Sequence, residues 1–319
     1  MAVLVGIDEA GFGPLLGPLV VSSSSFSLPC HLLNSDLWQI LEKSVGKTRK
    51  HLAGRLLITD SKKAYNKSVG IKGLERTVLA VLKSLSQEPA DLNELVELLC
   101  PDCLERLGDY PWYGDFKNFL LSSDVADRAI ASNVFANDLT SNGIELLDVR
   151  SSCLDVAHYN EMVEAVKNKA NVLFTAICQL IKRAYDNFAG DDLQIIVDRQ
   201  GGRVRYRKNL QRMFPNMNLK ILREDNIISS YELQLDEKVM RIHFVVGADG
   251  KYLPVSLASM ISKYLRELLI GNINKYFTCL GEGLKPTAGY WKDGMRFVKD
   301  LKNNFPHIQF NSKQLIRCR

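Results

Sequence analysis

Two adjacent acids, Asp8 and Glu9, stand at the end of an apolar run near the start of the chain, within residues 6–18, GIDEAGFGPLLGP. Successive side chains of a strand point to opposite faces, so neighbouring carboxylates meet at one point only where the strand ends and the backbone turns. The glycines and prolines that follow permit such a turn. Two further acids have a similar setting, because Asp198 ends a second apolar run and Asp249 precedes a long helical pattern.

Carboxylates gathered at strand ends would repel one another and would need cations beside them. In open α/β sheets, distant residues meet at the ends of strands, where ligands bind. Oxygen ligands without His or Cys partners select Mg²⁺ or Mn²⁺. Two such ions about 4 Å apart can activate a water and stabilise the leaving oxygen of a phosphodiester. The residues alone leave this phosphoryl-transfer hypothesis beside a plainer one, in which the acids are solvated turn residues.

The patterning of the chain predicts the elements that would position these acids. Apolar and β-branched runs predict strands at 2–7, 18–27, 56–59, 143–150, 193–197 and 220–222, and alternation predicts a hairpin over 231–247. Helical spacing covers 37–41, 72–86, 158–188 and 255–277, with 158–188 expected as one helix. Residues 87–140 are the least regular part, so we expect an inserted lid or small subdomain there. The alternation of strands and helices predicts an α/β fold with a central mixed sheet flanked by helices.

The bulk composition predicts a soluble protein with a sizeable core. The chain has 319 residues and is 46% hydrophobic, which argues against disorder as a description of the whole. No apolar run is long enough to cross a bilayer, and the N-terminus lacks a basic segment followed by an apolar one. We therefore expect an intracellular, cytoplasmic protein.

Charge is unevenly distributed along the chain. Residues 199–223 contain eight Lys and Arg residues and no acid, whereas residues 86–127 contain ten acids against Arg106 and Lys117. A basic block beside an acidic site suggests a polyanionic partner. A solvated charged face is an equally good explanation of the basic block taken alone.

The seven cysteines are an odd number, which argues against a closed disulfide framework. Cys100 and Cys103 form a CPDC pair, but the chain has no second Cys-x-x-Cys. A zinc site would normally need such a second pair or nearby His residues. The sequence therefore favours surface cysteines in a loop over a metal site.

The opening stretch GIDEAGFGPLLGPLVV closely resembles the first motif of the type 2 ribonucleases H (ribonuclease HII), GIDEAGRGPLAGPVV. Residues 60–63, DSKK, are similar to that family's DSKKL segment, and residues 248–267 resemble its AD-x-x-Y-x-x-VSAASIxAKVxRD block. Gly289-Tyr290 resembles the GY of its later HKGY element. The four blocks stand in the family's order and anchor residues 1–27, 56–63 and about 158–291. The chain thus looks like a divergent member with a large insertion, and its last 25 residues have no evident counterpart.

The resemblance implies a ribonuclease H-like fold and hydrolysis of the RNA strand of RNA/DNA hybrids, or of ribonucleotides embedded in DNA, with two Mg²⁺ or Mn²⁺ ions. It implies a catalytic domain of residues 1–86 and 141–319 and an inserted segment at 87–140. The implied partner is nucleic acid, with no membrane and no small-molecule cofactor. The catalytic and metal-binding residues that it implies are Asp8, Glu9, Asp198 and Asp249. The implied nucleic-acid-binding residues are Gly11, Phe12 and Gly13 at the ribonucleotide, Lys62, Lys63, Ser256 and Lys263 towards the backbone, and Tyr290 at the sugar of the RNA–DNA junction.

Two departures from the family pattern keep other functions open. Phe12 stands where the family has Arg, which removes a charged phosphate contact worth roughly 1–3 kcal/mol. Asp198 is followed by Arg199, where the family's third acid precedes Gly. The alternatives are a non-cleaving nucleic-acid-binding protein and a nuclease of the same fold acting on another structure, such as branched DNA. The sequence also predicts that Gly13→Val strains the turn and abolishes activity in a folded protein.

Overall fold

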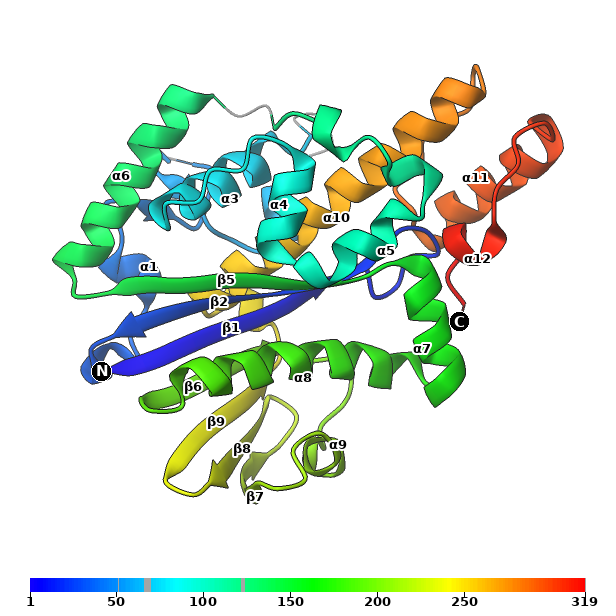
Figure 1. The fold of residues 1–319 in the computed structure, drawn as a ribbon. Helices are drawn as coiled ribbons and strands as arrows, with labels where there is room; N and C mark the ends of the chain where they lie inside the picture. Colours follow the sequence, from blue (N-terminus) through cyan, green and yellow to red (C-terminus); the bar gives the residue numbers. More distant parts are fainter. Residues whose placement is uncertain (51, 66–69, 122–123, 319) are drawn as a thin grey trace.

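The computed structural model describes residues 1–50, 52–65, 70–121 and 124–318 (Figure 1). Within them, a mixed sheet of seven strands has the order β5-β2-β1-β6-β9-β8-β7, with helices on both faces. The strands of this sheet are β1 (Ala2–Ala10), β2 (Leu19–Leu28), β5 (Glu145–Leu154), β6 (Asp192–Asp198), β7 (Asn218–Glu224), β8 (Ile228–Leu235) and β9 (Lys238–Val245). Strands β1, β6 and β9 are parallel neighbours, and the other pairings are antiparallel. The predicted α/β fold with a central mixed sheet flanked by helices is confirmed.

The side chains of β1 alternate between two apolar cores. Val3, Val5 and Ile7 pack in the core beneath α7 (Val156–Val166), α8 (Lys169–Phe188) and α9 (Arg207–Met213), whereas Leu4 packs in the core beneath α10 (Leu253–Leu280). On the α10 side, a Cβ added to Gly6 would lie 2.2 Å from the carbonyl carbon of Pro254. Glycine at this position therefore allows the start of α10 to lie directly on the strand that carries the acidic pair.

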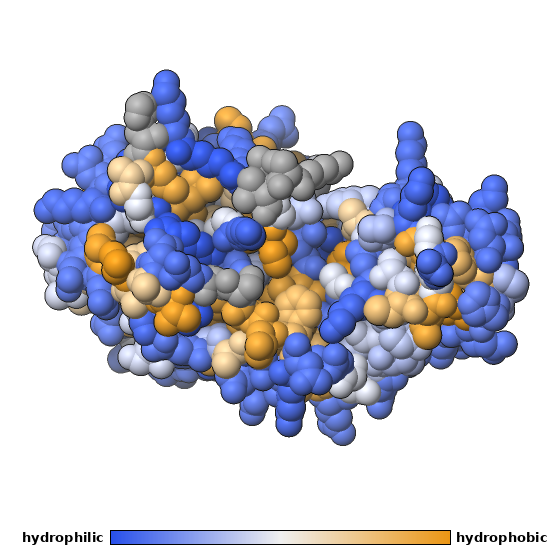
Figure 2. Space-filling model, turned by 90° about the horizontal axis from the view of Figure 1, so that it is seen from above, coloured by the Kyte–Doolittle hydropathy of each residue, from blue (hydrophilic) through white to orange (hydrophobic). Residues whose placement is uncertain are grey.

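The remaining helices contribute side chains to the apolar core on the α10 side of the sheet. They are α1 (Leu37–Ile40), α2 (Ser61–Ala64), α3 (Lys72–Ser84), α4 (Leu92–Leu99), α5 (Leu104–Gly108), α6 (Val125–Ser141), α11 (Trp291–Asn304) and α12 (Ser312–Leu315), with a small parallel pair of strands, β3 (Val45–Gly46) and β4 (Leu56–Leu57). Helix α12 also packs against α7. Seen from above, apolar groups interrupt a largely hydrophilic surface (Figure 2). None of the described helices combines the length and the apolar character that crossing a membrane requires.

Several predicted elements differ from the observed ones. The single helix expected over 158–188 is two helices, because Lys167 has a positive φ of 50° and the Asn168 side chain caps α8 by accepting from the Ala170 amide at 2.9 Å. The strand expected at 56–59 is only two residues long, and the DSKK segment forms α2. The helices α9, α11 and α12 were not predicted.

Residues 87–140 are more regular than the sequence pattern indicates. They contain α4, α5 and α6 together with the 3₁₀ turns η2 (Pro101–Cys103), η3 (Pro111–Tyr113) and η4 (Phe116–Asn118). Their buried side chains belong to the same apolar cluster as those of α10. Trp112, for example, lies with its ring centroid 5.5 Å from that of Phe277. The separation of this segment from a catalytic domain stays a prediction.

Candidate active site at the ends of three parallel strands

The register of the sheet brings three of the acidic points to one edge. Ile7 of β1 pairs with Val197 of β6 in the last pair of the parallel ladder, so Asp8 and Asp198 lie side by side just beyond it. The strand does not end there as predicted, because β1 continues to Ala10 in its pairing with β2. Asp198 in turn pairs with Val245 near the end of β9, and the chain continues from there to Asp249 in the 3₁₀ turn η5 (Ala248–Gly250). Neighbouring strands lie about 4.8 Å apart, so the backbones that carry these acids are close together at this edge.

Hydrogen bonds fix these carboxylates and the backbone that carries them. The Glu9 amide donates to Asp8 Oδ1 at 2.7 Å, and the Ala248 amide donates to Asp198 Oδ1 at 2.7 Å. Helix α10 supports the same edge, because the Ser262 hydroxyl donates to the Asp8 carbonyl at 3.0 Å. The Ser256 hydroxyl donates to the Asp249 carbonyl. Ser256 and Ser262 of α10 therefore fix the backbone at Asp249 and Asp8 by hydrogen bonds to the two carbonyls.

The acids share one electrostatic environment. Burial raises the pKa of Asp8 well above its usual value, and the charges of Glu9 and Asp198 raise it further. Burial and Asp198 raise the pKa of Glu9 to about 7, and burial and Asp249 raise the pKa of Asp198 to about 6. Burial raises the pKa of Asp249 as well. Raised pKa values of this kind mark carboxylates that lack a sufficient counter-charge.

The carboxylate oxygens of these acids are the ligands that a hard divalent cation prefers. Lys62 is a nearby cation, and its charge lowers the pKa values of Glu9 and Asp198. The side chains do not close around a single point. Among the residues that the structure describes, no three Asp, Glu, His or Cys side chains are arranged so that they could hold a metal ion. The acids are therefore close enough to raise one another's pKa values, but their carboxylate oxygens do not converge on a single point.

Asp60 is a fifth acid of this group that the sequence analysis did not single out. It caps α2 by accepting from the Lys62 amide at 2.9 Å, and its charge raises the pKa of Asp249. Asp60 is the first residue of the DSKK segment, in which the sequence analysis assigned a role only to Lys62 and Lys63. Both lysines, Lys62 and Lys63, are exposed beside the acids.

The turn after β1 depends on Gly11. Its φ is +96°, and an added Cβ would lie 2.7 Å from Arg266 Nε and from the Pro18 carbonyl oxygen. Gly13 has no such constraint, since its φ lies outside the left-handed region and nothing lies within 4 Å of an added Cβ. The expectation that Gly13→Val strains the turn is therefore wrong, and Gly11 is the constrained position.

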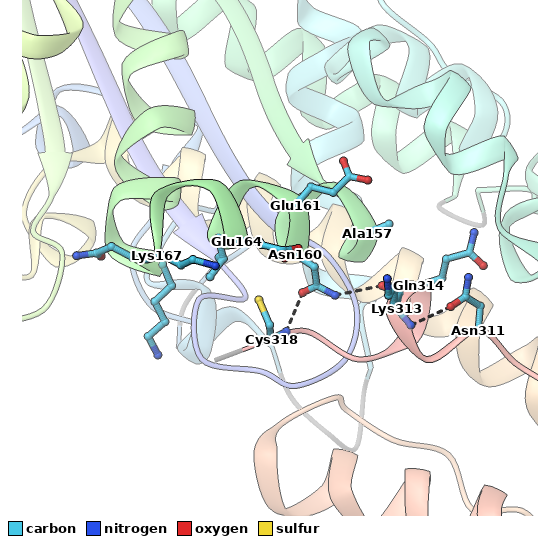
Figure 3. Close-up of a pocket in the computed structure, with 12 residues that line it drawn as sticks. Ala157, Asn160, Glu161, Glu164, Lys167, Asn311, Lys313, Gln314 and Cys318 are labelled. Atoms are coloured by element: carbon cyan, nitrogen blue, oxygen red, sulfur yellow. Dashed lines mark hydrogen bonds between the residues drawn. The ribbon is translucent and has the colours of Figure 1, made fainter.

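The C-terminal segment holds this turn. The Arg317 guanidinium donates to the Gly11 carbonyl and, at 3.2 Å, to the Phe12 carbonyl, and it lies 4.1 Å from the centre of the Tyr159 ring. Asn160 of α7 fastens the segment, because its Nδ2 donates to the Ile316 carbonyl at 2.9 Å. Its Nδ2 also donates to the Lys313 carbonyl at 3.1 Å, and its Oδ1 accepts from the Cys318 amide at 2.7 Å (Figure 3). Sequence reasoning missed Arg317, which lies 306 residues from Gly11.

Phe12 lies in this turn, and Tyr290 and Lys263 are linked to it through Arg266, which lies beside Gly11 and 5.5 Å from the centre of the Tyr290 ring. Phe12 is half-buried, with the Lys169 ammonium 5.2 Å from its ring centre. Tyr290 is 51% exposed. Lys263 pairs with Glu267 at 2.6 Å and lies 6.0 Å from the Tyr290 ring centre. Ser256, in contrast, is fully buried within α10.

Only part of the basic stretch 199–223 faces solvent. Arg199 is buried and donates to the Ser229 hydroxyl and to the Asp225 carbonyl, each at 2.8 Å. The exposed members lie on and beside α9 and on β7, and they are Arg205, Arg207, Lys208, Arg212, Lys220 and Arg223. These exposed cations follow Asp198 in the sequence, and those on β7 lie at the edge of the sheet, separated from β6 by β9 and β8.

Gly11→Ala and Gly13→Ala are expected to differ. The Gly11 change forces a side chain into a left-handed conformation and against Pro18, which costs about 1–3 kcal/mol and shifts the turn. We expect a melting temperature lower by several degrees for this variant and no change for Gly13→Ala. Thermal denaturation of both purified proteins measures the difference, and equal melting temperatures would contradict the constraint on Gly11.

The acidic group is expected to make the metal-free protein less stable as the pH rises. Glu9 titrates near 7 in the folded chain against a usual value of 4.5, so the folded state binds its proton more tightly than the unfolded state does. Stability from this source is present below about pH 4 and is lost between about pH 4 and 7. The melting temperature of the metal-free protein should fall as the pH rises across this range, and it should fall less steeply for Glu9→Gln. Adding Mn²⁺ at pH 8 should recover the loss, and a metal-independent melting temperature would contradict this account.

Comparison with models of known protein families finds no match to the chain, and comparison with curated proteins finds none either. Comparison with solved structures does find matches. A chain of the PCNA:RNase HII complex from Archaeoglobus fulgidus is 15% identical, over 99% of this chain and 94% of that chain, with a TM-score of 0.49. The RNase H3 of Aquifex aeolicus is 15% identical, over 98% of this chain and 71% of that chain, with a TM-score of 0.45. Bst-RNase HIII in complex with Mn²⁺ is 12% identical, over 99% of this chain and 66% of that chain, with a TM-score of 0.47. Over nearly its whole length, the chain is similar to solved structures of ribonucleases HII and HIII.

Proposed function

We propose that the chain is a divalent-metal-dependent endonuclease of the type 2 ribonuclease H family, which hydrolyses the RNA strand of RNA/DNA hybrids or ribonucleotides embedded in DNA. One observation carries the proposal. Asp8, Glu9, Asp198 and Asp249 lie near the carboxyl ends of β1, β6 and β9, and burial and neighbouring carboxylates raise the pKa values of Asp8, Glu9 and Asp198. A charged group of this kind is costly for a protein that does not use it.

These four residues would hold Mg²⁺ or Mn²⁺, and two bound ions would activate the attacking water and stabilise the leaving oxygen. The chain's own contribution is to fix the donors in advance. The amides of Glu9 and Ala248 orient the carboxylates of Asp8 and Asp198, while the serines of α10 hold the loop backbone. Lys62 and Lys63 are exposed beside the acids, where their ammonium groups suit a phosphate of the substrate strand.

The Gly11-Phe12-Gly13 turn would read the ribose. Its position next to the acids and the open space at Gly13 support this role, since a sugar can approach the backbone there. The 2′-hydroxyl is the group that distinguishes RNA from DNA at a given position. Half-exposed Tyr290 lies near the same turn and offers a flat face for a sugar or a base.

The test uses the purified chain with Mg²⁺ or Mn²⁺ and three labelled substrates, namely an RNA/DNA hybrid, DNA with one embedded ribonucleotide, and a four-way DNA junction. We expect metal-dependent cleavage of one or both ribonucleotide-containing substrates, leaving 5′-phosphate and 3′-hydroxyl ends. Cleavage of the junction alone would replace this proposal by a structure-specific nuclease. Binding without cleavage of any substrate would identify a non-cleaving nucleic-acid-binding protein.

A further inference from the structure

Three thiols meet where residues 92–108 pack against the edge strand β5. Cys100 ends α4, Cys103 lies in η2, and Cys153 lies on β5, and all three are at most 3% exposed. The Cys103 and Cys100 sulfurs are 3.5 Å apart, and the Cys103 thiol also donates to the Cys100 carbonyl at 3.1 Å. The Cys153 thiol lies close enough to both of the others to shift their pKa values. The expectation that the CPDC pair lies at the surface is therefore wrong.

The surroundings favour a charged sulfur at one of the three positions. Once Cys103 is ionised it accepts hydrogen bonds instead of donating them, and those from Cys100 and Cys153, together with the charge of Arg106, lower the pKa of Cys103 to about 5. Arg106 is itself fixed, because its Nε donates to Asp155 at 2.8 Å. Thiolates rather than thiols are the reactive form of cysteine. Among the described residues no Cys, His, Asp or Glu group is arranged to hold a metal ion, so the thiols are not a preformed metal site.

We propose that Cys100 and Cys103 form a reversible redox site, which a hydroperoxide oxidises to an intramolecular disulfide while Cys153 supports the reactive sulfur as a hydrogen-bond donor. The short Cys-x-x-Cys spacing and the sulfur–sulfur contact within one turn assign these two as the bonded pair. The turn that carries the pair is close to solvent, because Pro101 and Asp102, which lie between the two cysteines in sequence, are exposed and line a surface cavity of about 690 Å³. The site is independent of the proposed nuclease function.

The reaction proceeds in two balanced steps. The Cys103 thiolate attacks the hydroperoxide, the O–O bond breaks, the alcohol or water leaves with a proton, and Cys103 becomes a sulfenic acid. The Cys100 sulfur then attacks the Cys103 sulfur, the S–O bond breaks, and water leaves with the Cys100 proton. The two thiols lose two electrons in total, and the peroxide gains them. An external thiol reverses the sequence by exchange.

Closing the disulfide shortens the sulfur–sulfur distance from 3.5 Å to about 2.0 Å. The turn that moves lies next to a network around Asp155, in which Tyr110 donates to Oδ1 at 2.5 Å and Arg106 donates to Oδ2. Asp155 caps α7 by accepting from the His158 amide at 3.0 Å. Oxidation is thus expected to change the position of Asp155 and with it the hydrogen bond that caps the start of α7.

The experiment uses the full chain with its exposed thiols removed by Cys30→Ser, Cys279→Ser and Cys318→Ser. The reduced, folded protein is treated with hydrogen peroxide, denatured, alkylated, digested with trypsin without reductant and analysed by mass spectrometry. Both cysteines lie in the tryptic peptide Ser84–Arg106. We expect this peptide to be unalkylated and about 2 Da lighter than its reduced form, and dithiothreitol to restore alkylation. Cys178 on α8 is buried but lies outside the group of three thiols, so it is the internal control. It should still be alkylated after peroxide treatment and denaturation.

A second pair of variants tests the order of the steps. In Cys100→Ser, the sulfenic acid at Cys103 has lost its partner and should be trapped by dimedone, whereas Cys103→Ser should leave Cys100 unmodified. Free thiols at both positions after peroxide treatment would overturn the proposal. So would a Cys103–Cys153 disulfide as the main product, or sulfinic acid at Cys103 in the wild-type chain.

Discussion

Replacing Asp8 by Asn is expected to lower metal-dependent cleavage by roughly 10³-fold while the protein stays folded. The amide keeps an oxygen that can accept from the Glu9 backbone but carries no charge for a cation. Asp8 is 6% exposed and its pKa is raised well above normal, so its ionised form is destabilised in the folded chain. The variant should therefore be at least as stable as the wild type in metal-free buffer at pH 8.

Two measurements on the same preparation test this expectation, namely the cleavage rate of the preferred substrate with Mn²⁺ and the melting temperature with and without Mn²⁺. Asp186→Asn is the matched control, because it makes the same chemical change in an exposed residue of α8 that pairs with Lys182. The control should retain full activity. Substantial cleavage by Asp8→Asn, or a large loss of stability in metal-free buffer, would contradict the role assigned to the acidic group.

Local patterns were sufficient to predict the elements that carry the acids. Apolar runs predicted β1 and β6, although β1 extends three residues beyond the predicted 2–7, and alternation over 231–247 predicted the hairpin that contains β9. The spacing that became α10 is helical. Their parallel pairing brings Asp8 beside Asp198 without any further information. The break between α7 and α8 also had a local signal, in the Asn168 cap, but apolar periodicity on both sides concealed it.

Features that depend on distant parts of the chain could not be predicted in the same way. The burial of Cys100 and Cys103 results from packing against β5, about 50 residues further along the chain, and no local pattern encodes that contact. The importance of Gly11 rather than Gly13 depends on where Arg266 and Pro18 lie. Both glycines flank Phe12 in one short turn, and only the tertiary structure shows which of them is constrained.

Arg317 is the clearest such case and leads to the second large expected effect. Arg317→Met should lower kcat/KM on ribonucleotide-containing substrate by roughly 100-fold, since small displacements of a positioning group have effects of this size. The Gly11 and Phe12 carbonyls lose their shared donor, and the Tyr159 ring loses its cation. Arg317→Lys should recover only part of the loss, because an ammonium group cannot replace the planar fork of donors.

Lys313→Ala is the matched control on the same segment, since only its carbonyl contacts Asn160. A positioning role for Arg317 predicts a change that differs between substrates. The loss should be larger on DNA with one embedded ribonucleotide, where a single 2′-hydroxyl must be read at the turn, than on a continuous hybrid, which offers one at every nucleotide of its RNA strand. Equal losses on both substrates, in step with a fall in melting temperature, would instead identify Arg317 as a stabilising residue only. Wild-type activity of Arg317→Met would show that the turn keeps its conformation without the C-terminal segment.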